Sequence, residues 1–221
     1  MKLLIEALTK FVCGLLLVGL LIFLPAGTLQ YTYGWLFIGL LFVPMLIAGF
    51  VMLAKSPEFL KKRLDAREKQ GTQKSVVAIS GLMFIAGFVV AGLDFRYGWS
   101  AIPTWVVITA SVLFLVAYAL YAEVMRENAY LSRTIKVEEG QTVVDTGMYG
   151  IVRHPMYAVT ILLFLMIPLV LGSWYGLIAF AFYPAVIVVR LKDEEELLTK
   201  ELPGYGEYKQ KVKYRIIPFI W

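Results

Sequence analysis

The sequence predicts an all-α fold, a polytopic membrane helix bundle with about six transmembrane helices. Of its 221 residues, 60% are apolar and only 17% are charged, and the mean hydropathy is +0.74. Soluble domains are nearer half apolar and a quarter charged. The other two observations are long runs without any charged side chain and the placement of Lys and Arg between them. This composition excludes a disordered or collagen-like chain.

The charge-free runs predict where the helices lie. A bilayer core about 30 Å thick needs roughly 20 helical residues. Residues 11–54 carry no charge, and Pro25 and Gly27 interrupt them near the middle, so this run predicts a helical hairpin. The apolar stretch 154–189 has 36 residues and a break at 171–173, which is barely enough for two crossings. The predicted crossings are 8–27, 33–54, 75–93 and 97–122, followed by two short ones within 154–189.

The connections between these runs predict the orientation of the chain. Seven basic residues lie in 55–74, four in 123–153 and seven from position 190 onward, whereas the opposite side carries only Arg96. Because short cytoplasmic loops are enriched in Lys and Arg, we expect both termini to be cytoplasmic. The net charge of +5 therefore reports orientation, and we expect no nucleic-acid partner. Glu6 and Lys10 near the start of the first run favour a retained helix over a cleaved leader.

A short amphipathic segment follows the second crossing. Ser56 and Pro57 are typical of a helix start, and Gly71 is typical of a helix stop, so we expect a helix over 56–71. Its apolar side chains fall on one side and its basic side chains on the other. The segment is either a helix lying on an anionic membrane surface or a solvated connector.

The residue inventory restricts the chemistry. Cys13 is the only cysteine and His154 the only histidine, so no intramolecular disulfide can form and we expect no conventional metal site. A glycine-rich dinucleotide fingerprint is absent, which excludes the usual soluble nucleotide-binding fold.

The segment before the fifth crossing gathers polar and aromatic side chains. Residues 134–144 alternate as in short extended segments and turn at 139–140. Pro155 favours a helix start at that position, which places His154 at the cytoplasmic rim of the bilayer. A single histidine at such a rim is more often a hydrogen-bonded interfacial residue than a ligand-binding one.

The exit of the sixth crossing is unexpectedly acidic. Arg190 and Glu194 are one helical turn apart and could form an ordinary ion pair. However, acidic residues at a bilayer exit are disfavoured beside anionic headgroups. A cationic ligand would explain them, because a partly desolvated carboxylate attracts a cation by about 4 kcal/mol at 4 Å and an effective dielectric of 20.

Three stretches taken together resemble a known family. They read GMYGIVRHPMY, RLKDEEELL and YGEYKQKVKYRIIPFIW, and they lie within residues 123–221. This combination is similar to the integral-membrane methyltransferases of the isoprenylcysteine carboxyl methyltransferase family, especially its short microbial members. More distantly, it resembles phospholipid N-methyltransferases.

The resemblance implies S-adenosylmethionine as methyl donor and assigns roles to individual residues. Arg190 takes the place of the family's substrate-orienting arginine. The implied cofactor contacts are Gln141, Thr142, Val143, Val144, Tyr149, His154, Pro155, Met156, Tyr157, Glu194 and Glu195. Gln141 departs from the family, which usually has histidine there. The implied division is a four-helix membrane region, 1–122, and a methyltransferase module, 123–221, with a cofactor loop, two short membrane helices and cytoplasmic carboxy-terminal helices.

The implied reaction leaves several alternatives open. The acceptor is lipophilic and enters from the bilayer, while the cofactor enters from the cytosol. An isoprenylcysteine-like carboxylate needs no general base, because it is ionised at neutral pH. A phospholipid amine would need a proton acceptor, with Glu195 or His154 as candidates. A sterol-type reductase and a non-catalytic membrane protein are the rivals from other classes. The acceptor's identity and the oligomeric state stay open.

Overall fold

The computed structural model describes residues 1–64, 71–131 and 135–221. Within these ranges every regular element is helical, which confirms the predicted all-α class. The elements are α1 (Lys2–Ala26), α2 (Thr32–Lys55), α3 (Pro57–Leu64), α4 (Gly71–Tyr97), α5 (Thr104–Glu127), the 3-10 turn η1 (Gly147–Gly150), α6 (Pro155–Val170), α7 (Trp174–Phe180), α8 (Tyr183–Glu201) and α9 (Tyr205–Lys211).

The long helices are suited to a membrane. Among the described residues, five helical segments are long and apolar enough to cross one: α1, α2, α4 from Gln73, α5, and residues 174–201, which join α7 to α8. Helix α6 is a shorter apolar helix of 16 residues. A polytopic bundle with a short penultimate helix agrees with the pattern of charge-free runs. The final segment, which was also expected to be short, runs over 28 residues.

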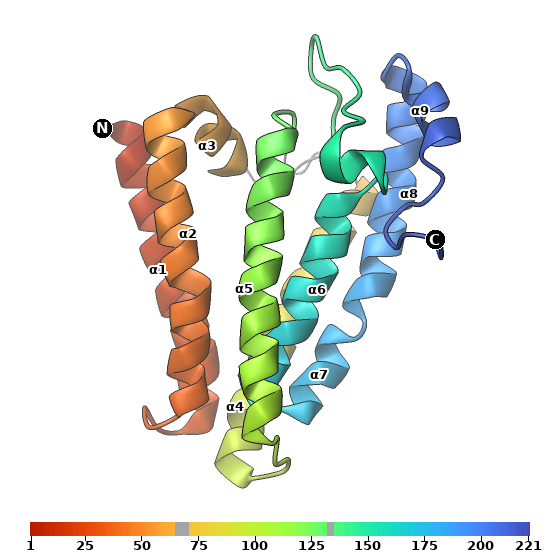
Figure 1. Ribbon diagram of the computed structural model, residues 1–221. Coiled ribbons are helices and arrows are strands. Elements are labelled where there is room, and N and C mark those ends of the chain that lie inside the picture. The colour runs from red at the N-terminus through yellow and green to blue at the C-terminus, as the bar shows by residue number, and fades with distance from the viewer. Residues whose placement is uncertain (65–70, 132–134) are drawn as a thin grey trace.

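The helices lie side by side and their connections gather at two ends (Figure 1). At one end lie α3, residues 135–154 and α9, together with the amino-terminus, and we call it the α9 end. The other, which we call the turn end, holds the connections 27–31, 98–103 and 171–173. At that end α1 stops where expected, because Gly27 has a φ of 69° and its N–H caps the last turn.

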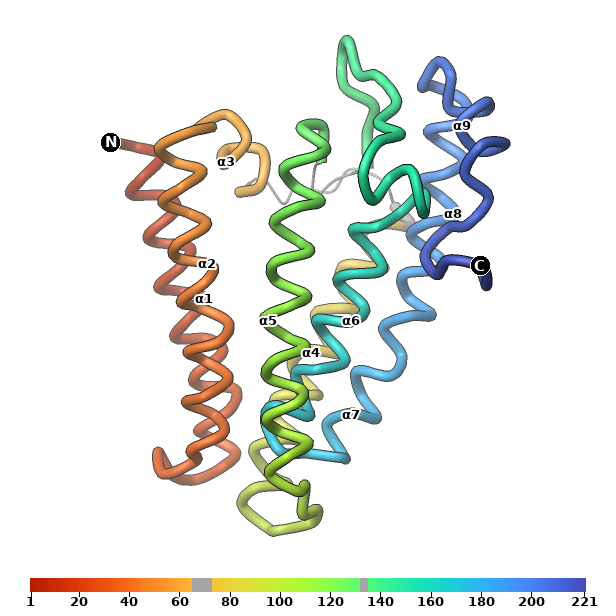
Figure 2. Tube along the Cα trace, in the orientation of Figure 1, coloured from red at the N-terminus to blue at the C-terminus, as the bar shows by residue number. Residues whose placement is uncertain are grey.

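The core lies between α4 and its neighbours. Helix α4 packs against α1, α7 and α8, and α5 packs against α6, so α6 lies with α4 behind it and α5 beside it (Figure 2). Buried phenylalanines join these helices: the ring centroid of Phe37 is 5.6 Å from that of Phe88 and 5.9 Å from that of Phe114. Gly87 permits the close approach of α7, because a Cβ there would lie 2.3 Å from Phe180 Cε2.

A buried carboxylate holds the turn end together. Asp94 is 1% exposed. It accepts hydrogen bonds from Ser100 N (2.8 Å), Ser100 Oγ (2.5 Å) and Ser173 Oγ (2.5 Å). Ser173 Oγ also accepts from Gly176 N at 2.9 Å and so caps α7. Because a buried charge is costly without partners, this cluster ties α4 to the start of α7.

Two local expectations differ from the structure. The helix expected over 56–71 is described as α3 over Pro57–Leu64, whereas 65–70 lie outside the described residues. Gly71, the expected stop, is the first residue of α4. Residues 135–144, expected as short extended segments, form no strand and contain a turn at 139–140, and residue 134 lies outside the described part.

Candidate active site at the α9 end

A cavity of about 460 Å³ opens at the α9 end. Its walls come from α3, α4, α5, residues 128–131 and 135–154, α6, α8 and α9. Ten of the twelve site residues named from sequence line it: residues 141–144, and Tyr149, His154, Met156, Tyr157, Arg190 and Glu194. Pro155 and Glu195 do not line it. Two stretches far apart in the chain therefore meet at one cavity.

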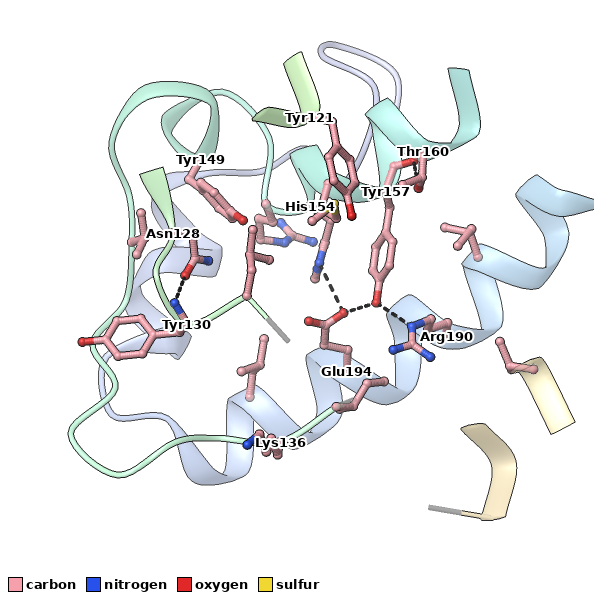
Figure 3. A pocket seen from close by; sticks show the side chains of 18 of the residues that line it. Tyr121, Asn128, Tyr130, Lys136, Tyr149, His154, Tyr157, Thr160, Arg190 and Glu194 are labelled. Atoms are coloured by element: carbon pink, nitrogen blue, oxygen red, sulfur yellow. Dashed lines mark hydrogen bonds and ion pairs between the residues drawn. The ribbon is translucent and has the colours of Figure 1, made fainter. Parts of the chain in front are cut away.

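A phenol joins two oppositely charged side chains of this cavity. Tyr157 Oη donates a hydrogen bond to Glu194 Oε2, and Arg190 Nε donates one to the same phenol oxygen at 3.1 Å. His154 lies beside them, with Nδ1 4.0 Å from Glu194 Oε2 (Figure 3). The hydroxyl thus accepts from the cation and donates to the carboxylate, which places one positive and one negative group in a single cavity.

Glu195 lies behind the cavity wall in a cluster of ion pairs. It is 4% exposed, and its carboxylate accepts from Arg153 Nε at 2.6 Å and from Arg215 Nε at 2.9 Å. His154 Nε2 lies 3.3 Å from the same carboxylate. Because a carboxylate can only accept, this contact puts a proton on Nε2. Glu195 therefore holds the ring of His154 from the side away from the cavity.

The segment after α9 closes this cluster. Arg153 N donates to Tyr214 O at 2.9 Å, and His154 N donates to Arg215 O at 2.8 Å. Arg153 Nη1 also donates to two carbonyls of the same segment, Val212 O and Lys213 O. These contacts connect the entry of α6 to residues 212–215. The carboxy-terminal segment thereby supports the histidine that borders the cavity.

Tyrosines from α9 complete the wall. Tyr205 and Tyr208 line the cavity, and Tyr208 Oη donates to Tyr149 O at 2.7 Å. Burial raises the pKa of Tyr205, and the carboxylates of Glu195 and Glu194 raise it further. The phenol is therefore neutral and can donate. Among the described residues its Oη is buried and has no hydrogen-bond partner, which is an arrangement that a bound ligand would satisfy.

The loop over the cavity is anchored to α3. Gln141 Oε1 accepts from Glu138 N at 2.9 Å, which closes the turn at its base. Glu138 pairs with Lys62 of α3 and, at 3.3 Å, with Lys136. Burial alone would raise the pKa of Glu138, but these two ammonium groups lower it below its ordinary value. Gln141, which stands where the resembled family has histidine, thus serves the loop while lining the cavity.

Several residues that line the cavity were not predicted from the sequence. Arg63, Tyr121, Asn128, Thr160, Tyr183 and the α9 tyrosines line the cavity without having been named. Tyr205 and Tyr208 had a usable signal, because residues three apart share a helix face. Arg153 was part of the quoted motif, and its charge beside the single histidine could have indicated a buried acidic partner. The others depend on packing between helices.

No metal site accompanies the cavity in the described part of the chain, where no three His, Cys, Asp or Glu side chains are grouped to hold an ion. The arrangement instead offers a carboxylate, a guanidinium, aromatic faces and a neutral phenol donor. Such a set suits an organic ligand with both cationic and anionic groups.

Comparison with known proteins gives this site a family context. Residues 103–200 match the model of the isoprenylcysteine carboxyl methyltransferase (ICMT) family. The match covers this segment, which is slightly less than half of the chain. It runs from the start of α5 almost to the end of α8, and the match points to a methyltransferase. The supports contributed by α4, α9 and residues 212–215 lie outside it.

Two relatives extend the comparison. The chain is 27% identical over 165 residues to the "Uncharacterized protein YpbQ" of Bacillus subtilis (strain 168), an alignment that covers 74% of this chain and 95% of that protein. It is also 33% identical over 91 residues to "Delta(14)-sterol reductase TM7SF2" of Mus musculus. That second alignment covers 40% of this chain and only 22% of the reductase.

Proposed function

We propose that this protein transfers a methyl group from S-adenosylmethionine to a lipophilic acceptor, a carboxylate of the isoprenylcysteine kind, at the cytoplasmic face of a membrane. The observation that carries the proposal is the cavity in which Glu194 and Arg190 lie on either side of the Tyr157 hydroxyl. One charged group suits a cationic donor, and the other suits an anionic acceptor.

The side chains of the cavity fit the donor. S-adenosylmethionine carries a sulfonium, an ammonium, a carboxylate and an adenine, and it supplies the methyl group for a displacement at carbon. Glu194 offers a carboxylate to a cation, and the faces of Tyr149 and Tyr157 attract cations by roughly 0.5–2 kcal/mol. The unpartnered Oη of Tyr205 offers a buried hydrogen-bond donor.

Arg190 is suited to hold the acceptor. Its planar fork matches a carboxylate in a way that a lysine would not. An acceptor carboxylate is ionised at neutral pH, so the residues need only orient it and exclude water. A guanidinium at that position also disfavours an acceptor ammonium, which ranks phospholipid amine N-methylation second.

The apolar part of the cavity wall and the distribution of charge support entry of the acceptor from the bilayer and of the cofactor from the cytosol. Val76, Val77 and Phe84 of α4 and Ile187 of α8 line the cavity, and an apolar wall of this kind suits a prenyl or acyl chain. Among the described residues that follow the second crossing, the basic side chains belong to segments that extend toward the α9 end, Arg96 being the exception. This charge asymmetry supports a cytoplasmic orientation.

The similarity to a sterol reductase motivates the second candidate, reduction with a nicotinamide cofactor. A phosphate-bearing cofactor prefers arginines and helix amino-termini. The cavity is lined by Arg63, Arg153 and Arg190 as well as by Glu194, so the choice between the two donors falls to the experiment below. A non-catalytic membrane protein is the third possibility. It would not account for a buried Tyr205 hydroxyl that has no hydrogen-bond partner in the described part of the chain.

One experiment separates these functions. The purified protein is incubated with S-adenosylmethionine carrying a labelled methyl group and, in parallel, with total membrane lipids or a prenylated cysteine analogue. We expect label on the prenylated analogue. Label on lipid amines would favour N-methylation. Thermal protection by NADPH, with none by S-adenosylhomocysteine, would contradict methyl transfer altogether.

A further inference from the structure

A buried amide on α4 lies next to the proposed acceptor site. Gln73 is 0% exposed and belongs to a helical segment long and apolar enough to cross a membrane. It lies outside residues 103–200 and does not line the cavity. Because a polar group in such surroundings is costly unless it is hydrogen-bonded, its partners indicate why it is there.

Both ends of the amide are engaged by α8. Arg190 Nη1 donates to Gln73 Oε1 at 3.1 Å, and Gln73 Nε2 donates to Asp193 Oδ2 at 2.8 Å. Residues 190 and 193 are three apart and share one face of the helix. The opposite orientation of the amide would set its NH₂ against the guanidinium and its oxygen against the carboxylate, so the chemistry of the partners fixes this one.

The guanidinium of Arg190 is therefore held from two helices. Tyr157 of α6 accepts from Nε, and Gln73 of α4 accepts from Nη1. Two contacts to different atoms of a planar group define its plane as well as its position. Tyr157 also donates a hydrogen bond to Glu194, the residue proposed to face the methyl donor. A continuous chain of contacts therefore joins Glu194 to Gln73 through Tyr157 and Arg190.

We propose that Gln73 is a positioning residue: it sets the plane of the Arg190 guanidinium, and with it the direction from which that group meets an acceptor carboxylate. This inference rests on the proposed function. Asp193 completes the arrangement by fixing the other end of the amide. Catalysis by orientation is sensitive to small misplacements. Loss of Gln73 is therefore expected to impair the reaction of the methyl acceptor and to leave binding of the methyl donor unchanged.

The first test removes both hydrogen bonds while keeping the side-chain length, with Gln73→Met. The KM for the prenylated cysteine analogue is expected to rise, or kcat to fall, so that kcat/KM drops at least tenfold. The Kd for S-adenosylhomocysteine is expected to stay within twofold of wild type. Ser111→Ala is the matched control, because it removes a hydroxyl of α5 whose hydrogen bond among the described residues is to Val107 O of its own helix.

The second test restores the contacts with exchanged chemistry. In the double variant Gln73→Glu/Asp193→Asn, the new carboxylate accepts from Arg190 and from the new amide, so both connections persist. We expect its kcat/KM to return to within about threefold of wild type. Gln73→Glu alone, which sets two carboxylates together, is expected to be less active than the double variant.

The outcomes are separable. Wild-type kcat/KM in Gln73→Met, or an equal loss of acceptor and cofactor binding, would overturn the positioning role while wild type remains active. Failure of the double variant to recover, although it unfolds at the wild-type temperature, would overturn it as well. An inactive wild-type protein would instead overturn the proposed function and this inference with it.

Discussion

The two ends of the bundle each bury an acidic side chain, and they use it differently. At the turn end, Asp94 accepts three hydrogen bonds from Ser100 and Ser173 and borders no part of the described cavity. At the α9 end, Glu195 is equally buried, and its neighbour Glu194 faces a cavity of about 460 Å³. A buried acid by itself therefore does not mark a site.

The two neighbouring carboxylates of the α9 end differ in the partners that they have. Glu195 and Glu194 are adjacent on α8, yet their side chains are 6% and 27% exposed. Glu195 is neutralised by Arg153 and Arg215, as in a structural ion pair. Among the described residues, Glu194 accepts a hydrogen bond from the Tyr157 phenol and has His154 Nδ1 4.0 Å away. A carboxylate that keeps capacity for a further partner beside a cavity is the feature that distinguishes the candidate site.

The largest expected effect tests the structural half of this contrast. Glu195→Ala leaves Arg153 buried without its carboxylate, and breaking such a pair costs about 3–5 kcal/mol. We expect the free energy of unfolding to fall by that amount in denaturant titrations of the detergent-solubilised protein. The neighbouring Glu196→Ala, which removes a solvent-exposed pair with Lys200, should change it little. Equal losses in the two variants would contradict the structural role of Glu195.

The next effect concerns turnover. Arg190→Ala removes the group proposed to orient the acceptor, and we expect kcat to fall at least ~100-fold, or about 2.7 kcal/mol of transition-state stabilisation. Cofactor affinity should remain within a few-fold in calorimetric titration. Lys192→Ala, an exposed cation two residues away, serves as the control. A large loss of cofactor affinity would show that Arg190 belongs to the donor side.

Asp94→Asn tests whether the turn end is structural only. Weakening charge-assisted hydrogen bonds at a buried position costs about 2 kcal/mol, so the melting temperature should fall. Binding of S-adenosylhomocysteine by the folded protein should be unchanged, because the cluster lies at the other end of the bundle. A specific loss of ligand affinity would break the distinction between the two ends.

The smallest expected effect tests the proposed role of Glu194 in binding the cofactor. Glu194→Gln keeps the shape and the acceptor oxygen for Tyr157 but removes the charge offered to a cation. We expect the Kd for S-adenosylmethionine to rise about tenfold, equivalent to about 1.4 kcal/mol. The measurement is repeated with an uncharged thioether analogue, for which a smaller change is expected. Unchanged affinity for the sulfonium form would remove Glu194 from the site.

Much of the fold was predictable because membrane insertion depends on local composition. A run of some 20 apolar residues predicts a crossing wherever it lies in the chain, and α1, α2, α4 and α5 follow such runs. Pro155 predicted the start of α6, since proline is favoured at a first helical position. The short turn at 139–140 was also visible, and the short extended segments expected around it form no strand.

The candidate site was only partly predictable. The motif residues around His154 and Glu194 carry a pattern of their own, and ten of the twelve named residues line the cavity. Glu195 could not be distinguished from Glu194 by sequence, because one position along a helix changes the facing direction by about 100°. Which carboxylate meets the arginines and which meets the cavity depends on the rotation of α8.

The sequence by itself determined the helices, including the short penultimate one, and the polar motifs, because each follows from contiguous residues and their hydropathy. Only the tertiary structure decided that Gln73 reaches Arg190 and that residues 212–215 support His154. These contacts join segments 117 and about 60 residues apart. Such pairings follow from side-chain packing between helices. Local composition and residue spacing do not predict them.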